Sequence, residues 1–281
     1  MARRPSFNNE PVSRLAAWSG RLALFALAVA ALSIIILRSG LLEIVPALAT
    51  FAAALVFAAL AVLLALASFV VIWRQGLSGL GYALLALFLG LLLLAYPAYL
   101  GYRASKLPAI SDITTDAVNP PRFDVLARLR PRGRVNYAGA AVFDRQRAAY
   151  SDIVPLQLSV PPKAAYDIVL SVVTKRKWLL VDTRPPAPPG RREGTIEAVA
   201  RTPIMGFRDD VAIRISPTAQ GARVDVRSAS RYGFHDFGTN AARVRSLLED
   251  IDDGVSNAPE PRPEPEKKTQ PAPKRQPANR R

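Results

Sequence analysis

Arginine and acidic residues recur at short spacing in the segment RSASRYGFHDFGTNAAR, which runs from position 227 to position 243. Arg227 and Arg231 are four residues apart and would share one face of a strand, and Arg243 follows in the next predicted helix. Planar guanidinium groups bind carboxylate or phosphate oxygens in pairs, so the three could clamp an anionic ligand. Internal ion pairing is the alternative that we favour, because structural networks also concentrate such residues. The partners it offers are Asp112, Asp116, Asp225 and Asp236.

The same segment has the residues of a strand-to-helix turn. Gly233 and Gly238 permit positive φ angles, and Asp236 or Asn240 can cap the first turn of a following helix. We therefore expect this motif to position the last helix of the domain.

Reaction chemistry finds little support in the residue types. A hydrolase would need His235, the one histidine, to reach Ser228 or Ser230 within a single turn, an arrangement that the alternation of a strand disfavours. With no cysteine, a zinc site of the usual nitrogen and sulfur ligands cannot be assembled. The sequence therefore predicts no catalytic residue, no metal site and no cofactor, with a hydrolase as the weakest of three hypotheses.

Alternating apolar and polar residues predict the strands that carry this segment. Ile196, Ala198 and Ala200 would point one way and Glu197 the other, so we expect a sheet with one buried face and one wet face. Apolar residues at helical spacing precede and follow these strands in the chain. In order, the predicted elements are strands at 156–160 and 178–183, with a helix at about 166–177 between them, strands at 195–201, 211–216 and 222–230, and a helix at 240–250.

This order of strand, helix, strands and helix predicts an α+β domain, an antiparallel sheet with two helices. Helix-grip folds, in which a sheet wraps a long last helix around an apolar cavity, share the order but not the short last helix expected here. A ligand-binding module for a lipid or another apolar ligand with an anionic head is thus the alternative to a packed structural or interaction domain.

A proline-containing stretch, residues 104–131, precedes the domain, and we expect it to form an extended strap. Within it, Asp112 and Asp116 flank a short strand or turn. Calcium binding by the two acids is conceivable, but too few further acids follow at loop spacing, so local turns are the more frequent outcome. The strap acids could instead pair with Arg227 and Arg231 and dock the strap on the sheet.

Several of these motifs together resemble the bacterial family named domain of unknown function 1499. The resemblance rests on the 227–243 motif, on the strap from Asp112 to Asp116, on Val135-Asn136-Tyr137 and on Tyr150-Ser151-Asp152-Ile153-Val154-Pro155. It covers about residues 112–251 and implies a shared fold and, in many members, membrane association. The family has no established activity to transfer, and Phe234-His235 departs from the polar residues expected before Asp236.

Three long apolar runs, at 18–37, 45–72 and 77–100, precede the strap. Each is long enough to cross a bilayer as a helix, which needs about 20 residues, and aromatic and basic residues flank them. A cleaved signal peptide is the alternative for the first run, but its apolar stretch exceeds the usual length of about 7–15 residues. We therefore expect a three-helix transmembrane region at 15–103.

Flanking basic residues indicate the orientation. An N-terminus in the cytoplasm would place five basic residues inside and three outside, so the bias favours a C-terminal domain outside the cytoplasm. The expected location is the bacterial inner (plasma) membrane, with a periplasmic domain. The absence of cysteine fits either compartment.

The net charge of +15 is spread over the spans, the domain and the tail, so no concentrated nucleic-acid footprint is present. Membrane lipids are the expected partners, with an anionic lipid or envelope polymer as a further candidate. The predicted boundaries are a cytoplasmic N-terminus at 1–14, the spans at 15–103, the strap at 104–131, the soluble domain at 132–254 and a disordered, proline-rich basic tail at 255–281.

Overall fold

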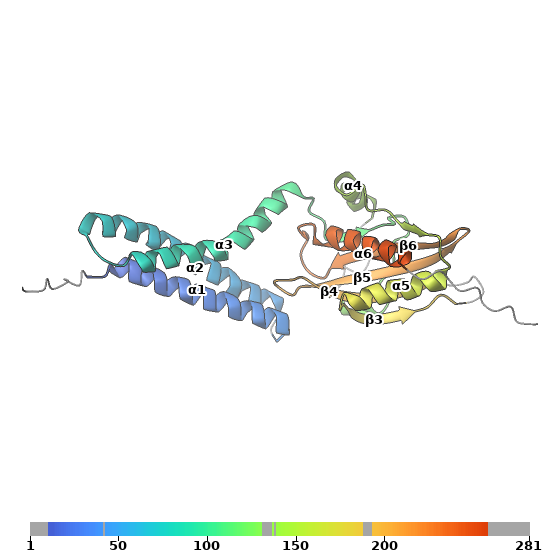
Figure 1. Ribbon diagram of the computed structural model, residues 1–281, viewed down its shortest axis with the longest axis horizontal. Helices are drawn as coiled ribbons and strands as arrows, with labels where there is room; N and C mark the ends of the chain where they lie inside the picture. Colours follow the sequence, from blue (N-terminus) through green and yellow to red (C-terminus); the bar gives the residue numbers. More distant parts are fainter. Residues whose placement is uncertain (1–10, 42, 131–136, 138, 188–192, 258–281) are drawn as a thin grey trace, which may run out of the picture.

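The computed structural model describes residues 11–41, 43–130, 137, 139–187 and 193–257. A bundle of three long helices leads into a domain in which helices and a sheet pack together (Figure 1). The first ten residues, the segment from Pro131 to Asn136 and the proline-rich tail beyond Asn257 lie outside the described residues, as do the predictions made for them.

The three helices are α1 (Arg14–Ser39), α2 (Ile44–Gln75) and α3 (Leu80–Lys106). Each has the length and the apolar composition to cross a membrane, as predicted. α1 and α2 end at Gly40 and Gly76, which adopt left-handed conformations and donate their amides to the carbonyls of Ile36 and Ile72. α3 contains Pro97 and bends away from the bundle toward the domain (Figure 1).

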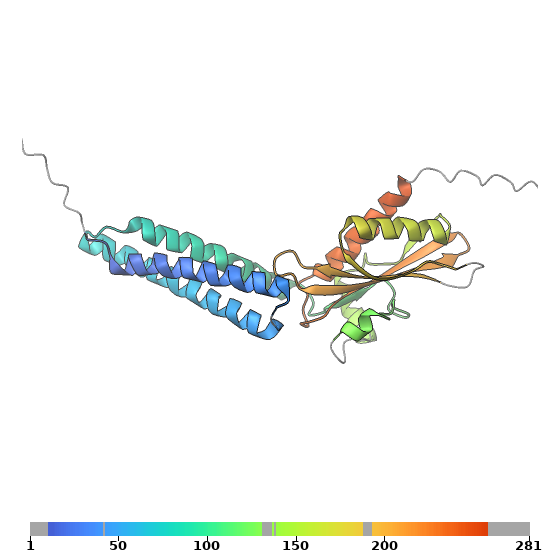
Figure 2. The same ribbon diagram turned by 90° about the horizontal axis from the view of Figure 1, so that it is seen from below.

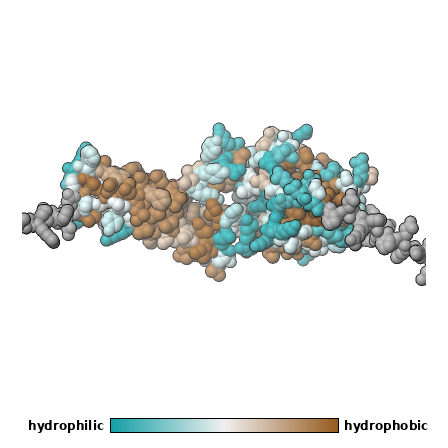
Figure 3. All heavy atoms as spheres, viewed as in Figure 1, coloured by the Kyte–Doolittle hydropathy of each residue, from teal (hydrophilic) through white to brown (hydrophobic). Residues whose placement is uncertain are grey.

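Small residues fill the interior of the bundle, whereas large apolar side chains face outward. The outer surface of the helices is accordingly mostly hydrophobic in the view of Figure 3. Alanine, glycine and serine let helix backbones approach closely where lipid offers no hydrophobic force between helices. All buried residues of the three helices are of this kind: Ala16, Ser19, Gly20, Ala23, Ala26, Ala30, Ser33, Ala47, Ala54, Ala58, Ala61, Ala65, Ser68, Ala83, Ala86 and Gly90.

The domain is built on one antiparallel sheet of order β1-β6-β5-β4-β3. The long hairpin of β5 and β6 lies at its centre, and β2 and β1 pair with the two ends of β6, which covers that edge. The strands are β1 (Asp112–Thr114), β2 (Leu156–Leu158), β3 (Leu179–Arg184), β4 (Gly194–Arg201), β5 (Arg208–Thr218) and β6 (Gly221–Ser230).

Helices α5 (Pro162–Lys175) and α6 (Thr239–Ser256) cover one face of the sheet (Figure 2). Val169 and Val173 of α5 and Leu247 of α6 are buried against the inward side chains of the strands, as the alternation predicted. These side chains fill the space between helices and sheet. α6 is longer than predicted, because its polar face continues through Asp252 and Asp253 after the last core residue, Ile251.

The other face of the sheet is not wet, and that prediction is wrong. The strap crosses it and forms a short 3-10 helix, η1 (Leu126–Leu129), while Phe123 and Leu126 pack on small apolar residues of the sheet. Glu197 and Arg227, which alternate with the core residues, are therefore buried rather than solvated. The predicted start of the strap at 104 is wrong, because α3 continues through Lys106; from Leu107 to Arg130 the strap contains the strand β1, a turn after Asp116 and η1, and no α-helix.

A further helix, α4 (Ala140–Ala149), was not predicted, because it lacks an apolar face. Its buried residue is Gln146, whose side-chain amide accepts the Thr114 amide at 3.1 Å and donates to the Thr114 carbonyl at 2.7 Å. The side chain thus replaces a neighbouring strand along the outer edge of β1.

Candidate functional site

The strap, residues 107–130, lies on the sheet through ion pairs that we call the strap network. Arg227 of β6 binds Asp112 of β1 through two hydrogen bonds, from Nε to Oδ1 at 3.0 Å and from Nη2 to Oδ2 at 2.7 Å. Its guanidinium also lies 4.5 Å from the ring centre of Phe123 and 5.6 Å from that of Tyr137. This buried cation thus lies over two aromatic rings, while Asp112 neutralises its charge.

The second part of the strap network surrounds Asp116. One carboxylate oxygen accepts the amides of Val118 and Asn119, and the other accepts Arg214 at 3.1 Å and Arg223 at 2.9 Å. Burial by itself would raise the pKa of Asp116, but these two amides and two guanidinium groups outweigh it and lower the pKa. Both arginines also bind the fully buried Asp225, so the carboxylates and cations neutralise one another.

The third part joins the end of the strap to β5. Asp210 is fully buried and accepts Arg231 at 2.8 Å and Arg130 of the strap at 2.8 Å. The sequence predicted that Arg231 would pair with a strap acid, with Asp225 or with Asp236, and that prediction is wrong. Arg231 follows the last residue of β6, where the neighbouring strand presents Asp210 on the same face.

Glu197 of β4 completes the contacts beneath the strap. Its carboxylate accepts three consecutive backbone amides, from Asp124 at 2.8 Å, Val125 at 3.2 Å and Leu126 at 2.8 Å. These amides precede and begin η1, where backbone donors have no partner within the helix. One buried side chain therefore fixes the turn that carries Leu126 into the sheet.

A separate polar cluster lies on the helix face of the sheet. Asn240 of α6 is fully buried and binds Ser228, Ser230 and the Ser111 carbonyl. Arg243 donates to Ser228 at 2.9 Å and to Asp209 at 2.6 Å. Because Arg243 is on this face and Arg227 and Arg231 are on the other, the three arginines do not converge on a common ligand.

Asp236 caps α6, one of the two alternatives predicted for this turn. Its carboxylate accepts the amides of Gly238 and Asn240 at 2.9 and 2.8 Å. Burial raises its pKa, although these two amides favour the charged form. His235 accepts the Phe237 amide on Nδ1 and stacks on the Phe237 ring, so the structure does not join it to Ser228 or Ser230.

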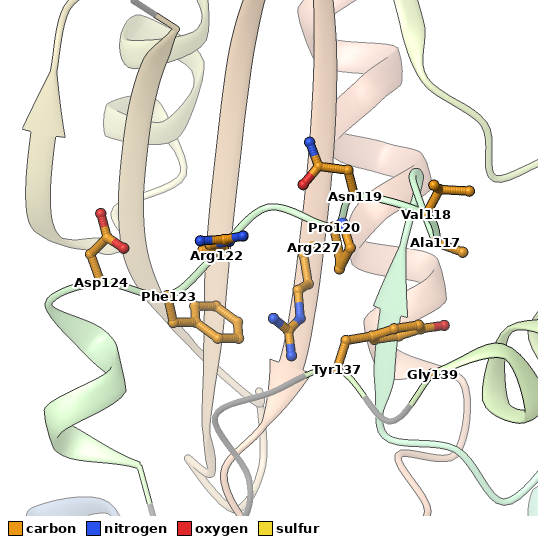
Figure 4. Close-up of a pocket in the computed structure, with 10 residues that line it drawn as sticks. All are labelled: Ala117, Val118, Asn119, Pro120, Arg122, Phe123, Asp124, Tyr137, Gly139 and Arg227. Atoms are coloured by element: carbon orange, nitrogen blue, oxygen red, sulfur yellow. The ribbon is translucent and has the colours of Figure 1, made fainter.

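An open hollow of about 470 Å³ adjoins Arg227 between the strap and Tyr137 (Figure 4). The Phe123 and Tyr137 rings lie on either side of the guanidinium in this view. The Tyr137 hydroxyl is buried and has no hydrogen-bond partner among the described residues, and burial together with Asp112 raises its pKa to about 12. A neutral phenol therefore lies beside an arginine whose charge Asp112 neutralises.

Sequence reasoning missed several members of these clusters, namely Arg130, Gln146, Glu197, Asp209 and Asp210. The adjacent acids Asp209 and Asp210 at the start of β5 were a usable signal. Neighbours in a strand point to opposite faces, so one acid serves each face of the sheet.

The fold and site define an α+β domain with a docked strap, attached to three helices of membrane-span character. The domain belongs to the family described as protein of unknown function (DUF1499), whose model matches residues 112–251. The match begins with β1, ends within α6 and leaves out the three helices.

Among solved structures, the crystal structure of protein MLL2253 from Mesorhizobium loti is similar at 15% identity, with a TM-score of 0.24, over 37% of this chain and 94% of that chain. Comparison with curated proteins gave no match.

Proposed function

We propose that the protein is a non-catalytic module of the bacterial inner membrane whose α+β domain has a structural or interaction role outside the cytoplasm. One observation carries this proposal. The three arginines of the 227–243 motif each hold a carboxylate of the same domain at 2.6–2.8 Å. Their charge is thus used to dock the strap and to fix α6, and little of it is left for an anionic substrate.

The two alternatives have weaker support. A hydrolase would bring His235 to Ser228 or Ser230, but Ser228 donates to Asn240 and His235 is engaged with Phe237. A helix-grip ligand module would need an apolar cavity beneath α6, and the core side chains occupy that space. Membrane lipids remain the expected partners, and the spread of basic charge does not favour nucleic acid.

Orientation can be tested by cysteine labelling, because the chain has no native cysteine. Val118 is 98% exposed on the strap, and Gln75 is exposed at the end of the bundle away from the domain. In spheroplasts, a membrane-impermeant maleimide should label Val118→Cys and spare Gln75→Cys until the membrane is permeabilised. The opposite pattern would place the domain in the cytoplasm and overturn this part of the proposal.

The structural role predicts a matching pair of variants. Arg227→Gln and Asp112→Asn should each loosen the strap, and the double variant should cost less than the sum of the two, because the single changes leave a buried charge uncompensated. Additive losses in thermal unfolding of the full chain would show that Arg227 and Asp112 do not act as a pair. A normal melting temperature in Arg227→Gln would contradict the structural role itself.

A further inference from the structure

The end of the domain nearest the bundle is hydrogen-bonded to the last turn of α1. Arg38, in the last turn of α1, donates to the carbonyls of Pro203 and Ile204 at 2.6 and 3.2 Å, and Arg201 donates to the Arg38 carbonyl at 3.2 Å. Arg38 directly follows the apolar residues of the first span. The β4–β5 turn, residues 202–207, therefore lies at the level of the lipid headgroups if α1 spans the membrane.

A second loop lies beside this turn. The Arg231 amide donates to the Arg208 carbonyl, which brings the β6–α6 loop alongside the start of β5. Large apolar side chains on the two loops are open to solvent: Ile204 is 43% exposed, Tyr232 51% and Phe234 80%. Exposed aromatic residues at this depth are typical of the membrane interface, where a ring can meet both acyl chains and headgroups.

A cleft of about 420 Å³ separates the helix ends from these loops. The ends of α1 and α2 contribute its apolar wall, with Leu37, Ile44 and Val45, and the domain contributes Arg208 and Tyr232. A Cβ on Gly40, the glycine that ends α1, would lie 3.5 Å from the Arg208 guanidinium. The apolar wall of the cleft thus continues onto the helix surface, and a cation lies at the rim of the cleft.

Charge at this end of the domain is mainly positive. Arg208 is exposed and forms no ion pair with the described residues, and Arg201 and Arg38 bind only carbonyls there. The last turn of α3 adds Arg103 and Lys106. Glu43 is the carboxylate that lines the cleft, whereas Asp210 is buried and neutralised by two arginines.

We propose that this end of the domain is a lipid-contact surface, consisting of the loops 202–208 and 231–234, and that the cleft binds an anionic phospholipid. The lipid phosphate would lie at Arg208, and its acyl chains would follow Ile44 and Val45 along α2. Tyr232 and Phe234 would lie among the headgroups. Continuity with the spans and the complementary charge select lipid as the occupant. The proposal depends on α1 to α3 being embedded, but not on which side the domain faces.

The depth of the loops can be measured in the full chain, reconstituted in nanodiscs that contain phosphatidylcholine and phosphatidylglycerol. A nitroxide on Phe234→Cys or Tyr232→Cys should be more accessible to oxygen than to a water-soluble nickel complex. The control, Val118→Cys, lies beside Asp116 and Arg223 at the far end of the sheet, and should report water. Equal nickel accessibility at all three positions would overturn the proposal. Spin–spin broadening between labels at position 234 would instead identify a second copy as the occupant.

Arg208→Gln tests whether the positive charge of the cleft binds the lipid. The control variant is Lys163→Gln, which removes a cation at the start of α5, near the opposite end of the sheet. Native mass spectrometry of protein released from the nanodiscs measures how much phosphatidylglycerol is retained relative to phosphatidylcholine. Loss of one cation near a surface should lower that preference about fivefold in Arg208→Gln. Lys163→Gln should retain the preference. Equal retention in Arg208→Gln and the unmodified chain would refute the role of Arg208.

Discussion

Removal of the Glu197 carboxylate should release the strap while leaving the central strands closed. In Glu197→Ala, the amides of Asp124, Val125 and Leu126 lose their acceptor. A hydrogen bond to a charged group contributes about 1.5–3 kcal/mol, and water can reach the half-open end of the strap and recover part of that loss. We expect the free energy of strap opening to fall by about 3 kcal/mol, which corresponds to roughly 150-fold faster amide exchange.

Hydrogen exchange of the full chain in detergent, read by mass spectrometry on peptides that cover residues 120–130, measures this effect directly. Glu197→Gln should show a smaller change, because its amide keeps one oxygen acceptor but turns a donor toward the backbone amides. Glu249→Ala is the matched control, since Glu249 is exposed on α6, on the opposite face of the sheet. Unchanged exchange in the strap would refute the reasoning. Equal acceleration in β5 and β6 would show that the strap does not open as a separate unit.

Three further changes test other contacts. Gly90→Val should destabilise the bundle by about 1–3 kcal/mol in detergent melts, because a Cβ there would lie 2.4 Å from a side chain of α2; Gly81→Val, with open space around it, should not. Asp210→Ala should lower the melting temperature more than Arg231→Ala, because it leaves two buried guanidinium groups without their carboxylate, at a cost of about 3–5 kcal/mol. The lowered pKa of the Asp116 carboxyl contributes stability that is fully present above pH 3.8 and is lost as the pH falls through the folded-state pKa. In Asp116→Asn, the free energy of unfolding should therefore depend less steeply on pH in that window.

The sequence was most informative in segments where a single pattern of apolar residues dominates. Apolar length identified the three spans, and alternation placed Ile196, Ile213 and Val224 on the core face of the sheet. The covering of the other face could not be read in this way. Alternating Glu197 and Arg227 look the same in sequence whether water or a strap faces them, and the difference depends on contacts with residues 71 to 115 positions away.

Pairing of charges was predictable only in part. The strap was expected to supply partners for the arginines, and Asp112 does bind Arg227. Periodicity gives the face of each residue but not the register between strands, so it could not show that Arg231 would meet Asp210. α4 could not be predicted for a related reason, because the polar side chain of Gln146, rather than an apolar stripe, attaches this helix to β1.

Two of the links between the helix bundle and the sheet, among the described residues, lie on different strands. α3 leads into β1 through only the residues 107–111, and the Ile110 carbonyl accepts the Asp236 amide beside the start of α6. Arg38 of α1 holds the β4–β5 turn on the opposite side of the sheet. A single link would let the domain rotate about the end of α3, whereas links at both β1 and the β4–β5 turn fix which end of the sheet lies next to the helix ends. The ion-paired strap follows β1 directly, so the charge network of the domain lies next to the first of these links.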